Sequence, residues 1–318
     1  MDAFEFEDME RTQSKLSVAI MGPSGSGKTT AAIKIAMGIR DQLYPGTSLK
    51  DIGLFVDSER RSSTKAVGRS VGGETLEALT LYSFEPPYDV YKLMKLMEFA
   101  VSKGKKIMIL DSGTHFWSGT NGILERVAEL EVQLAESKKM YGAWSEKEII
   151  AKKNALKNLM TSSDLHLIVC FRAKTEYVLE PNARGKLTPK AIGLKEDMQT
   201  DVRYEFDAFL SLDRDTHAVS ILKDRLGYAE IRMTSENPDA PITVEDGKIF
   251  AKLVAEGLSL EEIAARKRNK LITFVLDEKA HKSSKVKLFE EAKKIEFTKE
   301  YLDKLNYETL VKIVDYIK

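Results

Sequence analysis

The stretch from Leu16 to Ala36, LSVAIMGPSGSGKTTAAIKIA, joins an apolar run, a glycine-rich turn and an alanine-rich run. Within it, GPSGSGKT fits the pattern G-x-x-x-x-G-K-[ST] at every fixed position, and the strand before it and the helix after it are the context that this pattern needs. The glycines allow backbone N–H groups to turn toward phosphate oxygens, and the start of the helix adds partial positive charge. The stretch therefore predicts a strand, a phosphate-binding loop and a helix.

The predicted phosphate loop assigns distinct roles to two side chains. The Lys28 ammonium would reach the β- and γ-phosphates of a nucleoside triphosphate, and the Thr29 hydroxyl would be a ligand of Mg²⁺. We therefore expect ATP and Mg²⁺ as cofactors. The expected nucleotide-binding residues of the loop are Gly22, Pro23, Ser24, Gly25, Ser26, Gly27, Lys28, Thr29 and Thr30.

Acidic residues follow two other apolar runs. Asp111 ends the run IMILD, where its carboxylate would lie at the carboxyl end of a strand and help Thr29 to hold Mg²⁺. Asp57 and Glu59 follow the run LFV, and a carboxylate there could orient and deprotonate an attacking water. Spacing alone leaves open which of the two would act, and either could instead be a solvated turn residue.

Short apolar runs alternate with longer helical patterns over the first two-thirds of the chain, which is typical of a parallel sheet covered by helices. The expected strands are Leu16 to Met21, Ile52 to Val56, Leu79 to Phe84, Ile107 to Leu110, Leu165 to Phe171, Ala208 to Leu212 and Ala218 to Leu222. The expected helices are Thr30 to Leu43, Val90 to Lys103, Gly122 to Lys139 and Ser145 to Met160. The segment from Glu180 to Thr200 shows no clear periodicity, and we expect a long, functional loop there.

Composition predicts an ordinary globular protein without a large basic field. The chain has 318 residues, 43% of them hydrophobic, with 49 basic and 49 acidic residues. A single cysteine, four scattered histidines and an acidic, polar first segment favour a reducing cytoplasm and argue against a structural zinc site, a secretory signal and a membrane span. We expect an acidic tail over residues 1–14, an α/β core over residues 15–236 and a helical C-terminal domain over residues 237–318, with a capping box at Ser259 to Glu262.

Four motifs, GPSGSGKTT, FVDSE, ILDSG and SILKDRLG, occur in an order that resembles the RecA-like P-loop ATPases. That group includes RecA recombinases, hexameric helicases of the DnaB kind and KaiC-like proteins, and the likeness extends over about residues 15–232, with phage-encoded ATPases as the nearest type. The resemblance implies that Glu59, rather than Asp57, is the catalytic base acting with Lys28. It also implies that Lys223 and Arg225 reach across a subunit interface to a neighbour's γ-phosphate, where two cations would stabilise the charge of the transition state.

The strand HLIVCFRAK departs from this family, because it ends in Arg172 and Lys174 where recombinases carry a glutamine that senses the γ-phosphate. The resemblance also implies that Glu180 to Thr200 is a mobile loop that contacts DNA. The candidate DNA-binding residues are Arg172, Lys174, Arg184, Lys186, Lys190 and Lys195. Cations there would pair with phosphates and give affinity without sequence choice, although lysines on a loop can also be merely solvated.

The resemblance implies an ATPase that acts on single-stranded DNA in recombination, annealing or replication, encoded by a phage and present in the host cytoplasm. Its partners would be single-stranded DNA, further copies of the chain in a ring or filament and, as a further candidate, a single-strand DNA-binding protein. Two alternatives stay open. One is an ATP-dependent assembly switch of the KaiC kind that does not touch DNA, and the other is a hexameric, helicase-type translocase.

Overall fold

The computed structural model describes residues 9–59, 61–136, 142–161, 163–181, 187–199, 201–281 and 283–317. The chain divides into two compact units, one formed by Ser14–Val254 and the other by Met1–Gln13 together with Ala255–Lys318. We describe each unit separately.

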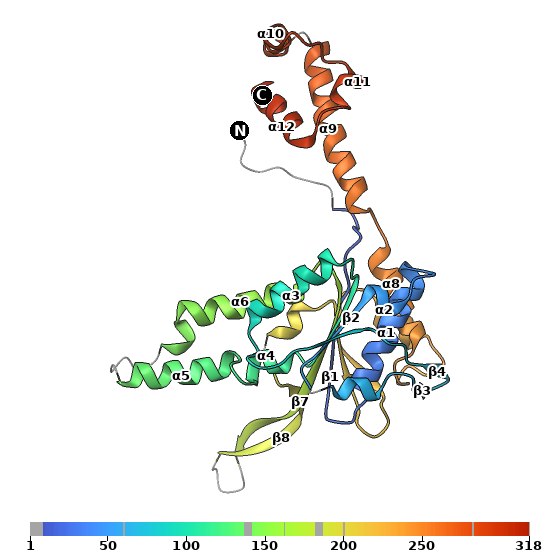
Figure 1. Ribbon diagram of the computed structural model, residues 1–318, viewed down its shortest axis with the longest axis vertical. Helices are drawn as coiled ribbons and strands as arrows, with labels where there is room; N and C mark the ends of the chain where they lie inside the picture. Colours follow the sequence, from blue (N-terminus) through green and yellow to red (C-terminus); the bar gives the residue numbers. More distant parts are fainter. Residues whose placement is uncertain are drawn as a thin grey trace. The chain divides into compact units, whose positions relative to one another are not determined.

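The first unit is a mixed α/β structure built on a mostly parallel sheet, as expected (Figure 1). The sheet runs in the order β10-β9-β1-β7-β6-β2-β5, and β8 pairs with β7 beyond it. Neighbours in this order are parallel except β9 and β10, and β7 and β8 are also antiparallel. The strands are β1 (Ser17–Gly22), β2 (Gly53–Asp57), β5 (Thr80–Ser83), β6 (Ile107–Asp111), β7 (His166–Pro181), β8 (Leu187–Glu196), β9 (Ala208–Leu212) and β10 (Val219–Asp224), with a separate short hairpin of β3 (Ser70–Val71) and β4 (Glu74–Thr75).

Alternate residues of the central strands supply two hydrophobic cores, one on each face of the sheet. Val18 and Ile20 of β1 belong to one core, whereas Ala19 and Met21 belong to the other, because successive side chains of a strand point to opposite faces. The first face is covered by α1 (Lys28–Leu43), α2 (Leu49–Ile52) and α8 (Val244–Ala255). The second is covered by α3 (Val90–Ser102), α4 (Thr114–Ser118), α5 (Ile123–Glu136) and α6 (Lys147–Thr161) (Figure 1). All the expected strands and helices of this unit are present, with ends that differ by a few residues, except that the strand expected to end at Phe171 continues to Pro181.

The expectation of a long loop from Glu180 to Thr200 was wrong. The strand β7 continues to Pro181, and residues 187–196 return as β8 in an antiparallel ribbon with it. Pro189 and Gly193 disfavour a strand, but proline is tolerated on a strand with a free edge. The ribbon satisfies the backbone hydrogen bonds of β7 after it has passed its neighbours in the sheet.

Helix α8 belongs to the first unit, although we expected the helical C-terminal domain to begin at residue 237. Its Gly247 packs closely on α1, since a Cβ atom there would lie 2.5 Å from the carbonyl oxygen of Ile35. Phe250 stacks on Tyr228 of α7 (Tyr228–Met233), with ring centroids 4.0 Å apart. The border between the two units therefore follows α8 rather than preceding it.

The second unit contains four helices among its described residues, α9 (Leu260–Ala280), α10 (Ser284–Lys293), α11 (Lys299–Leu302) and α12 (Tyr307–Ile317), around a small apolar core. The expected capping box is confirmed, because Ser259 and Glu262 each bond the other's backbone at the start of α9.

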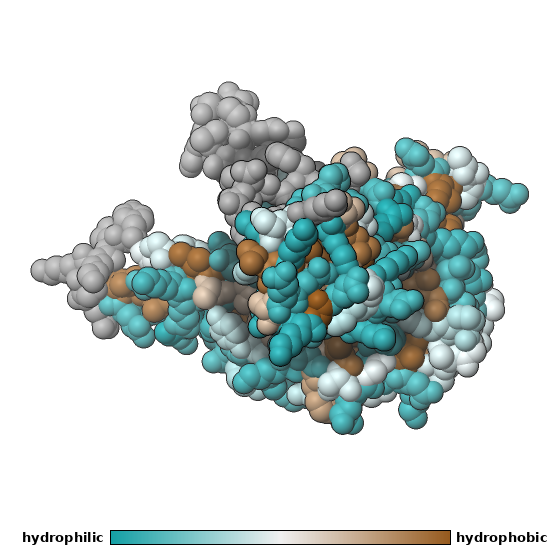
Figure 2. Space-filling view, turned by 90° about the horizontal axis from the view of Figure 1, so that it is seen from above, coloured by the Kyte–Doolittle hydropathy of each residue, from teal (hydrophilic) through white to brown (hydrophobic). Residues whose placement is uncertain are grey.

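Among the described residues, no helix has both the length and the apolar character that a membrane span needs. On the face shown in Figure 2, hydrophilic residues predominate and hydrophobic ones form small, separate groups.

Candidate functional site

A cavity of about 630 Å³ lies where the carboxyl ends of β1, β2 and β6 meet the middle of β7, at Arg172 and Ala173. Parallel strands place the residues that follow them at one edge of the sheet, so segments distant in sequence come together there. The cavity is lined by Gly22, Ser24, Gly25, Gly27, Lys28, Thr29, Thr30, Glu59, Lys65, Ala66, Arg69, Asp111, Arg172 and Ala173. The structure thus brings the predicted phosphate loop together with Asp111 and Glu59.

The backbone of the predicted phosphate loop requires glycine at defined places. Gly25 and Gly27 have φ angles of +83° and +88°, in the left-handed region that favours glycine. Gly22 has no room for a side chain, because a Cβ atom there would lie 2.9 Å from the carbonyl oxygen of Leu212. Helix α1 begins directly after this turn, at Lys28, whose Nζ donates hydrogen bonds of 2.9 Å to the carbonyl oxygens of Gly22 and Pro23. The ammonium group therefore lies against the start of the loop, beside the cavity.

Thr29 and Asp111 meet at the floor of the cavity, where the Thr29 hydroxyl donates a hydrogen bond of 2.6 Å to Oδ2 of Asp111. Burial raises the pKa of Asp111 to about 6, the bond from Thr29 opposes this rise, and the charge of Glu59 adds to it. A hydroxyl and a carboxylate oxygen suit Mg²⁺, which is usually held by one or two carboxylates, substrate phosphates and water. Thr29 and Asp111 thus offer two oxygens, and phosphates and water could complete the shell of the ion. Among the described residues, no group of three or more acidic, histidine or cysteine side chains is placed to hold a metal.

The geometry separates the two carboxylates that follow β2. Asp57 is buried, and its oxygens accept hydrogen bonds from the backbone N–H groups of Glu59 (2.7 Å), Arg61 (3.3 Å) and Ser63 (3.3 Å) and from the Ser63 hydroxyl. Its carboxylate is therefore used within the turn. Glu59, in contrast, lines the cavity.

Three cations of the cavity, Lys65, Arg69 and Arg172, extend the predicted nucleotide site. Nε of Arg172 donates a hydrogen bond of 2.9 Å to Oε1 of Glu59. Sequence reasoning placed Arg172 among the DNA-binding candidates and did not consider Lys65 or Arg69. Lys65 and Arg69 follow Glu59 by six and ten residues, in the same connection between strands. This proximity to Glu59 could have marked them as candidates for the site.

A group of polar side chains supports the turn that carries Glu59, and sequence reasoning missed it as well. The Ser58 hydroxyl accepts a hydrogen bond of 2.8 Å from the backbone N–H of Ser112 and lies 2.7 Å from Nδ1 of His115. Tyr88 stacks on the His115 ring and donates to the carbonyl oxygen of Ser58. Burial, and next the charge of Arg172, lower the pKa of His115. The carboxyl ends of β2 and β6 are thereby tied together beside the cavity.

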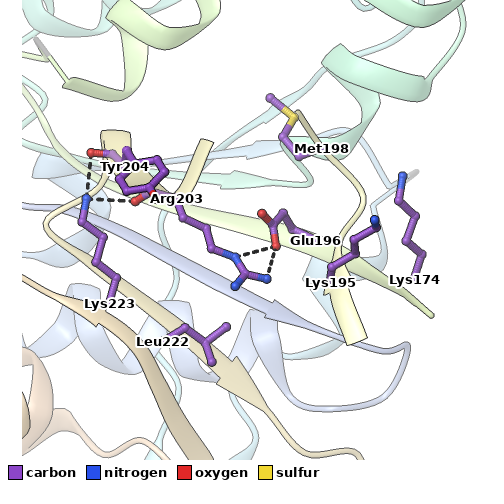
Figure 3. Close-up of a pocket in the computed structure, with 8 residues that line it drawn as sticks. All are labelled: Lys174, Lys195, Glu196, Met198, Arg203, Tyr204, Leu222 and Lys223. Atoms are coloured by element: carbon purple, nitrogen blue, oxygen red, sulfur yellow. Dashed lines mark hydrogen bonds and ion pairs between the residues drawn. The ribbon is translucent and has the colours of Figure 1, made fainter. Parts of the chain in front are cut away.

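Lys223 and Arg225 lie at the end of β10, away from the predicted phosphate loop, and Lys223 is level with Ala19 of β1 through Phe209 of β9. Nζ of Lys223 donates to the carbonyl oxygens of Arg203 (2.9 Å), Tyr204 (2.7 Å) and Phe206 (2.6 Å), and two of these contacts are drawn in Figure 3. Nη2 of Arg225 donates to the same Tyr204 carbonyl at 2.7 Å. Burial, and next the charge of Arg225, lower the pKa of Lys223. Both cations therefore hold the short 3₁₀ turn at Val202–Glu205 and do not reach their own subunit's loop.

A second cavity, of about 490 Å³, lies between the base of the β7–β8 ribbon and β10 (Figure 3). Its lining residues are Lys174, Lys195, Glu196, Met198, Arg203, Tyr204, Leu222 and Lys223. The structure thus divides the DNA-binding candidates, since Lys174 and Lys195 line this cavity while Arg172 lines the first. Lys190 lies on β8 with its side chain outside the described residues, and Arg184 and Lys186 lie outside them altogether.

No model of a known protein family matches the chain, and a search among curated proteins finds no match to it. The mixed α/β fold and the two cavities are then the observations that bear on function.

Proposed function

We propose that the chain is a RecA-like P-loop ATPase that binds ATP with Mg²⁺ and hydrolyses it. The observation that carries this proposal is the 2.6 Å contact between the Thr29 hydroxyl and the Asp111 carboxylate, in the same cavity as Lys28 and Glu59. A glycine turn that exposes N–H groups, a cation, a hydroxyl–carboxylate pair and a further carboxylate are the parts that phosphoryl transfer from a nucleotide requires.

In binding, the N–H groups at the start of α1 and the Lys28 ammonium would hold the phosphates, with Lys28 exchanging the carbonyl oxygens of Gly22 and Pro23 for phosphate oxygens. Thr29 and Asp111 would hold Mg²⁺, which neutralises charge on the β- and γ-phosphates when it is bound. Binding requires Asp111 as a carboxylate, and the charge of the bound cation would favour that form.

In hydrolysis, Glu59 would take a proton from a water molecule as the water oxygen forms a bond to the γ-phosphorus. The bond between that phosphorus and the bridging oxygen breaks, and ADP leaves with the electron pair. Glu59 suits this role because it lines the cavity, whereas Asp57 is occupied by the backbone of its own turn.

We further propose that the second cavity binds phosphates of single-stranded DNA, so that the ATPase serves recombination, annealing or replication. Lys174 and Lys195 are paired directly opposite each other on β7 and β8. Nζ of Lys174 donates a hydrogen bond of 2.7 Å to Oδ1 of Asp197, so a DNA phosphate would compete with this carboxylate, and the charges of both lysines would attract a polyanion. Tyr204, 69% exposed at the same cavity, offers a ring on which a base can stack.

The test is release of phosphate from ATP, with Mg²⁺ or with excess chelator, and with or without single-stranded DNA at two salt concentrations. We expect Mg²⁺-dependent hydrolysis that Lys28→Ala abolishes and that Lys50→Ala, an exposed lysine outside the cavity, retains. Full activity in Lys28→Ala would refute the ATPase proposal. Stimulation by DNA that is lost in Lys174→Ala/Lys195→Ala supports the DNA role, and strand unwinding would point to a translocase. A rate that DNA does not change, together with assembly that depends on ATP, would instead indicate an assembly switch.

A further inference from the structure

The ion pair between Arg172 and Glu59 joins two segments at the edge of the first cavity. Arg172 ends the part of β7 that pairs with β1, where it is in register with Gly22 at the start of the predicted phosphate loop. Glu59 lies two residues beyond β2, on the other side of β6. Their side chains meet across the end of β6 through the 2.9 Å bond from Nε to Oε1.

The guanidinium group of Arg172 has N–H donors that its bond to Glu59 does not use. It carries five N–H groups, and among the described residues only Glu59 accepts a hydrogen bond from it, through Nε. The terminal nitrogens Nη1 and Nη2, which form the planar fork that matches a phosphate, receive no such partner from the described chain. Arg172 also lines the same cavity as Lys28 and Thr29.

The backbone of Arg172 is fixed, whereas its side chain is not. The Thr114 hydroxyl accepts a hydrogen bond of 2.9 Å from the Arg172 N–H, and the Asp197 N–H donates one of 2.7 Å to the Arg172 carbonyl oxygen. The side chain itself is 51% exposed. A long side chain on a rigid base can exchange one acceptor for another without movement of the fold.

We propose that Arg172 distinguishes a triphosphate from a diphosphate, because its guanidinium exchanges Glu59 for the terminal phosphate. This inference rests on the proposed ATPase function and concerns the same site. When a γ-phosphate lies beside Lys28, the fork of Arg172 binds it, and the Glu59 carboxylate is released to accept a proton from water. With a diphosphate, Arg172 stays on Glu59. Arg172 is thus a ligand of the nucleotide and, through Glu59, a positioning residue for hydrolysis.

The test measures the affinities of fluorescent ADP and of a fluorescent, non-hydrolysable ATP analogue, both with Mg²⁺. We expect Arg172→Ala to weaken triphosphate binding about 10- to 100-fold, the scale of a lost charge-assisted, two-pronged contact, and to change ADP binding little. Arg172→Lys should restore part of the difference. Lys50→Ala, which changes an exposed lysine outside the cavity, should keep the wild-type ratio of the two affinities. Lys65→Ala shows whether another cation of the cavity makes the distinction instead.

A second measurement detects the exchange itself. Glu59 competes with the phosphate for Arg172, so Glu59→Gln should tighten triphosphate binding more in the wild-type background than in Arg172→Ala, where only the repulsion between Glu59 and the phosphates is removed. A purely structural ion pair would not produce this dependence. If Arg172→Ala keeps the wild-type ratio of triphosphate to diphosphate affinity while the wild type binds both, the inference about Arg172 is overturned and the ATPase proposal stands. If the wild type binds neither nucleotide, both fail.

Discussion

The Thr29 hydroxyl donates a 2.6 Å hydrogen bond to Oδ2 of Asp111 and so joins the first turn of α1 to the end of β6. Asp111 is buried, and this burial, which Glu59 reinforces, raises its pKa from 3.8 to about 6. The chain therefore holds a carboxyl group in a place where its ionised form is disfavoured. A divalent cation at the same place would reverse that preference, since its charge stabilises the carboxylate.

This carboxyl group should make the free protein less stable as pH rises. Between about pH 4 and pH 6 the folded state binds more protons at Asp111 than the unfolded state, so the free energy of unfolding falls as pH rises through that window. Asp111→Asn removes the titrating group. Without Mg²⁺ it should therefore gain on the order of 2–3 kcal/mol relative to wild type between about pH 4 and about pH 7. Urea unfolding at both pH values measures this. An unchanged difference between mutant and wild type would show that Asp111 ionises normally.

His166 should produce the opposite pH dependence. Its Nδ1 accepts a hydrogen bond of 3.1 Å from the Leu16 N–H, its Nε2 lies 3.2 Å from the Tyr44 hydroxyl, and burial lowers its pKa from 6.5 to about 3. The unfolded state then binds more protons, so stability present above about pH 6.5 is lost as pH falls toward 3. His166→Gln can accept the Leu16 bond without titrating. We expect it to be less stable than wild type by about 1–2 kcal/mol at neutral pH and to lose less on acidification. Thermal unfolding over this pH range tests the slope, and parallel curves for the two proteins would contradict the assignment.

Replacing Glu59 by its amide should slow hydrolysis, whereas replacing Asp57 by its amide should lower the stability of the fold. Glu59→Gln should bind ATP and hydrolyse it at least about a hundredfold more slowly, the scale of a lost general base, with an unchanged urea midpoint. Asp57→Asn should lose about 1–3 kcal/mol of stability, because an amide accepts fewer of the bonds that the Glu59, Arg61 and Ser63 N–H groups now donate. Phosphate release and urea unfolding separate the two. Normal turnover in Glu59→Gln would move the role of base to another group.

Local sequence patterns predicted the phosphate loop and Asp111. The other contacts of the site depend on turns and strand pairs that bring distant segments together. The sequence from Leu16 to Ala36 carries its strand, turn and helix within one segment, and Asp111 is placed by the end of its own strand, so both were predictable from residue order. The choice between Asp57 and Glu59 depends on the hydrogen bonds of a turn. Spacing does not encode these bonds, and the preference for Glu59 came from resemblance alone.

The ion pair between Arg172 and Glu59 could not be predicted from the sequence, for a different reason. The two residues are 113 positions apart, and their contact exists only because β6 lies between β2 and β7 in the sheet. The β7–β8 ribbon was missed because Pro189 and Gly193 weaken the local strand pattern, and pairing with β7 compensates for this weakness.

The resemblance to RecA-like ATPases, in which the residues matching Lys223 and Arg225 act on a neighbour's nucleotide, predicts that the active ATPase contains more than one copy of the chain. The Arg225 N–H donates to the Asp207 carbonyl oxygen, and the Asp207 N–H donates to the Ser17 carbonyl oxygen. Arg225 is therefore level with Ser17, the first residue of β1, whereas the phosphate loop begins at Gly22, the last residue of β1. A strand of this length spans roughly 17–20 Å, which separates Arg225 from the loop of its own chain. If the cations act on a neighbour, Lys28→Ala and Lys223→Ala/Arg225→Ala should each be inactive alone, and their mixture should recover activity.

Mixing these two variants is decisive because each supplies what the other lacks. At a head-to-tail interface, random mixing places an intact loop opposite intact cations at about a quarter of the sites, so recovery should approach about a quarter of the wild-type rate. Lys223 also holds the Arg203, Tyr204 and Phe206 carbonyls, so the double variant must first show normal unfolding and ATP binding. Lys50→Ala replaces the cation variant in a control mixture with Lys28→Ala, where activity should follow the fraction of the Lys50→Ala subunit. No recovery from variants that assemble together, or full activity in a monomer, would rule out action across an interface and leave both cations as supports of the turn at Val202–Glu205.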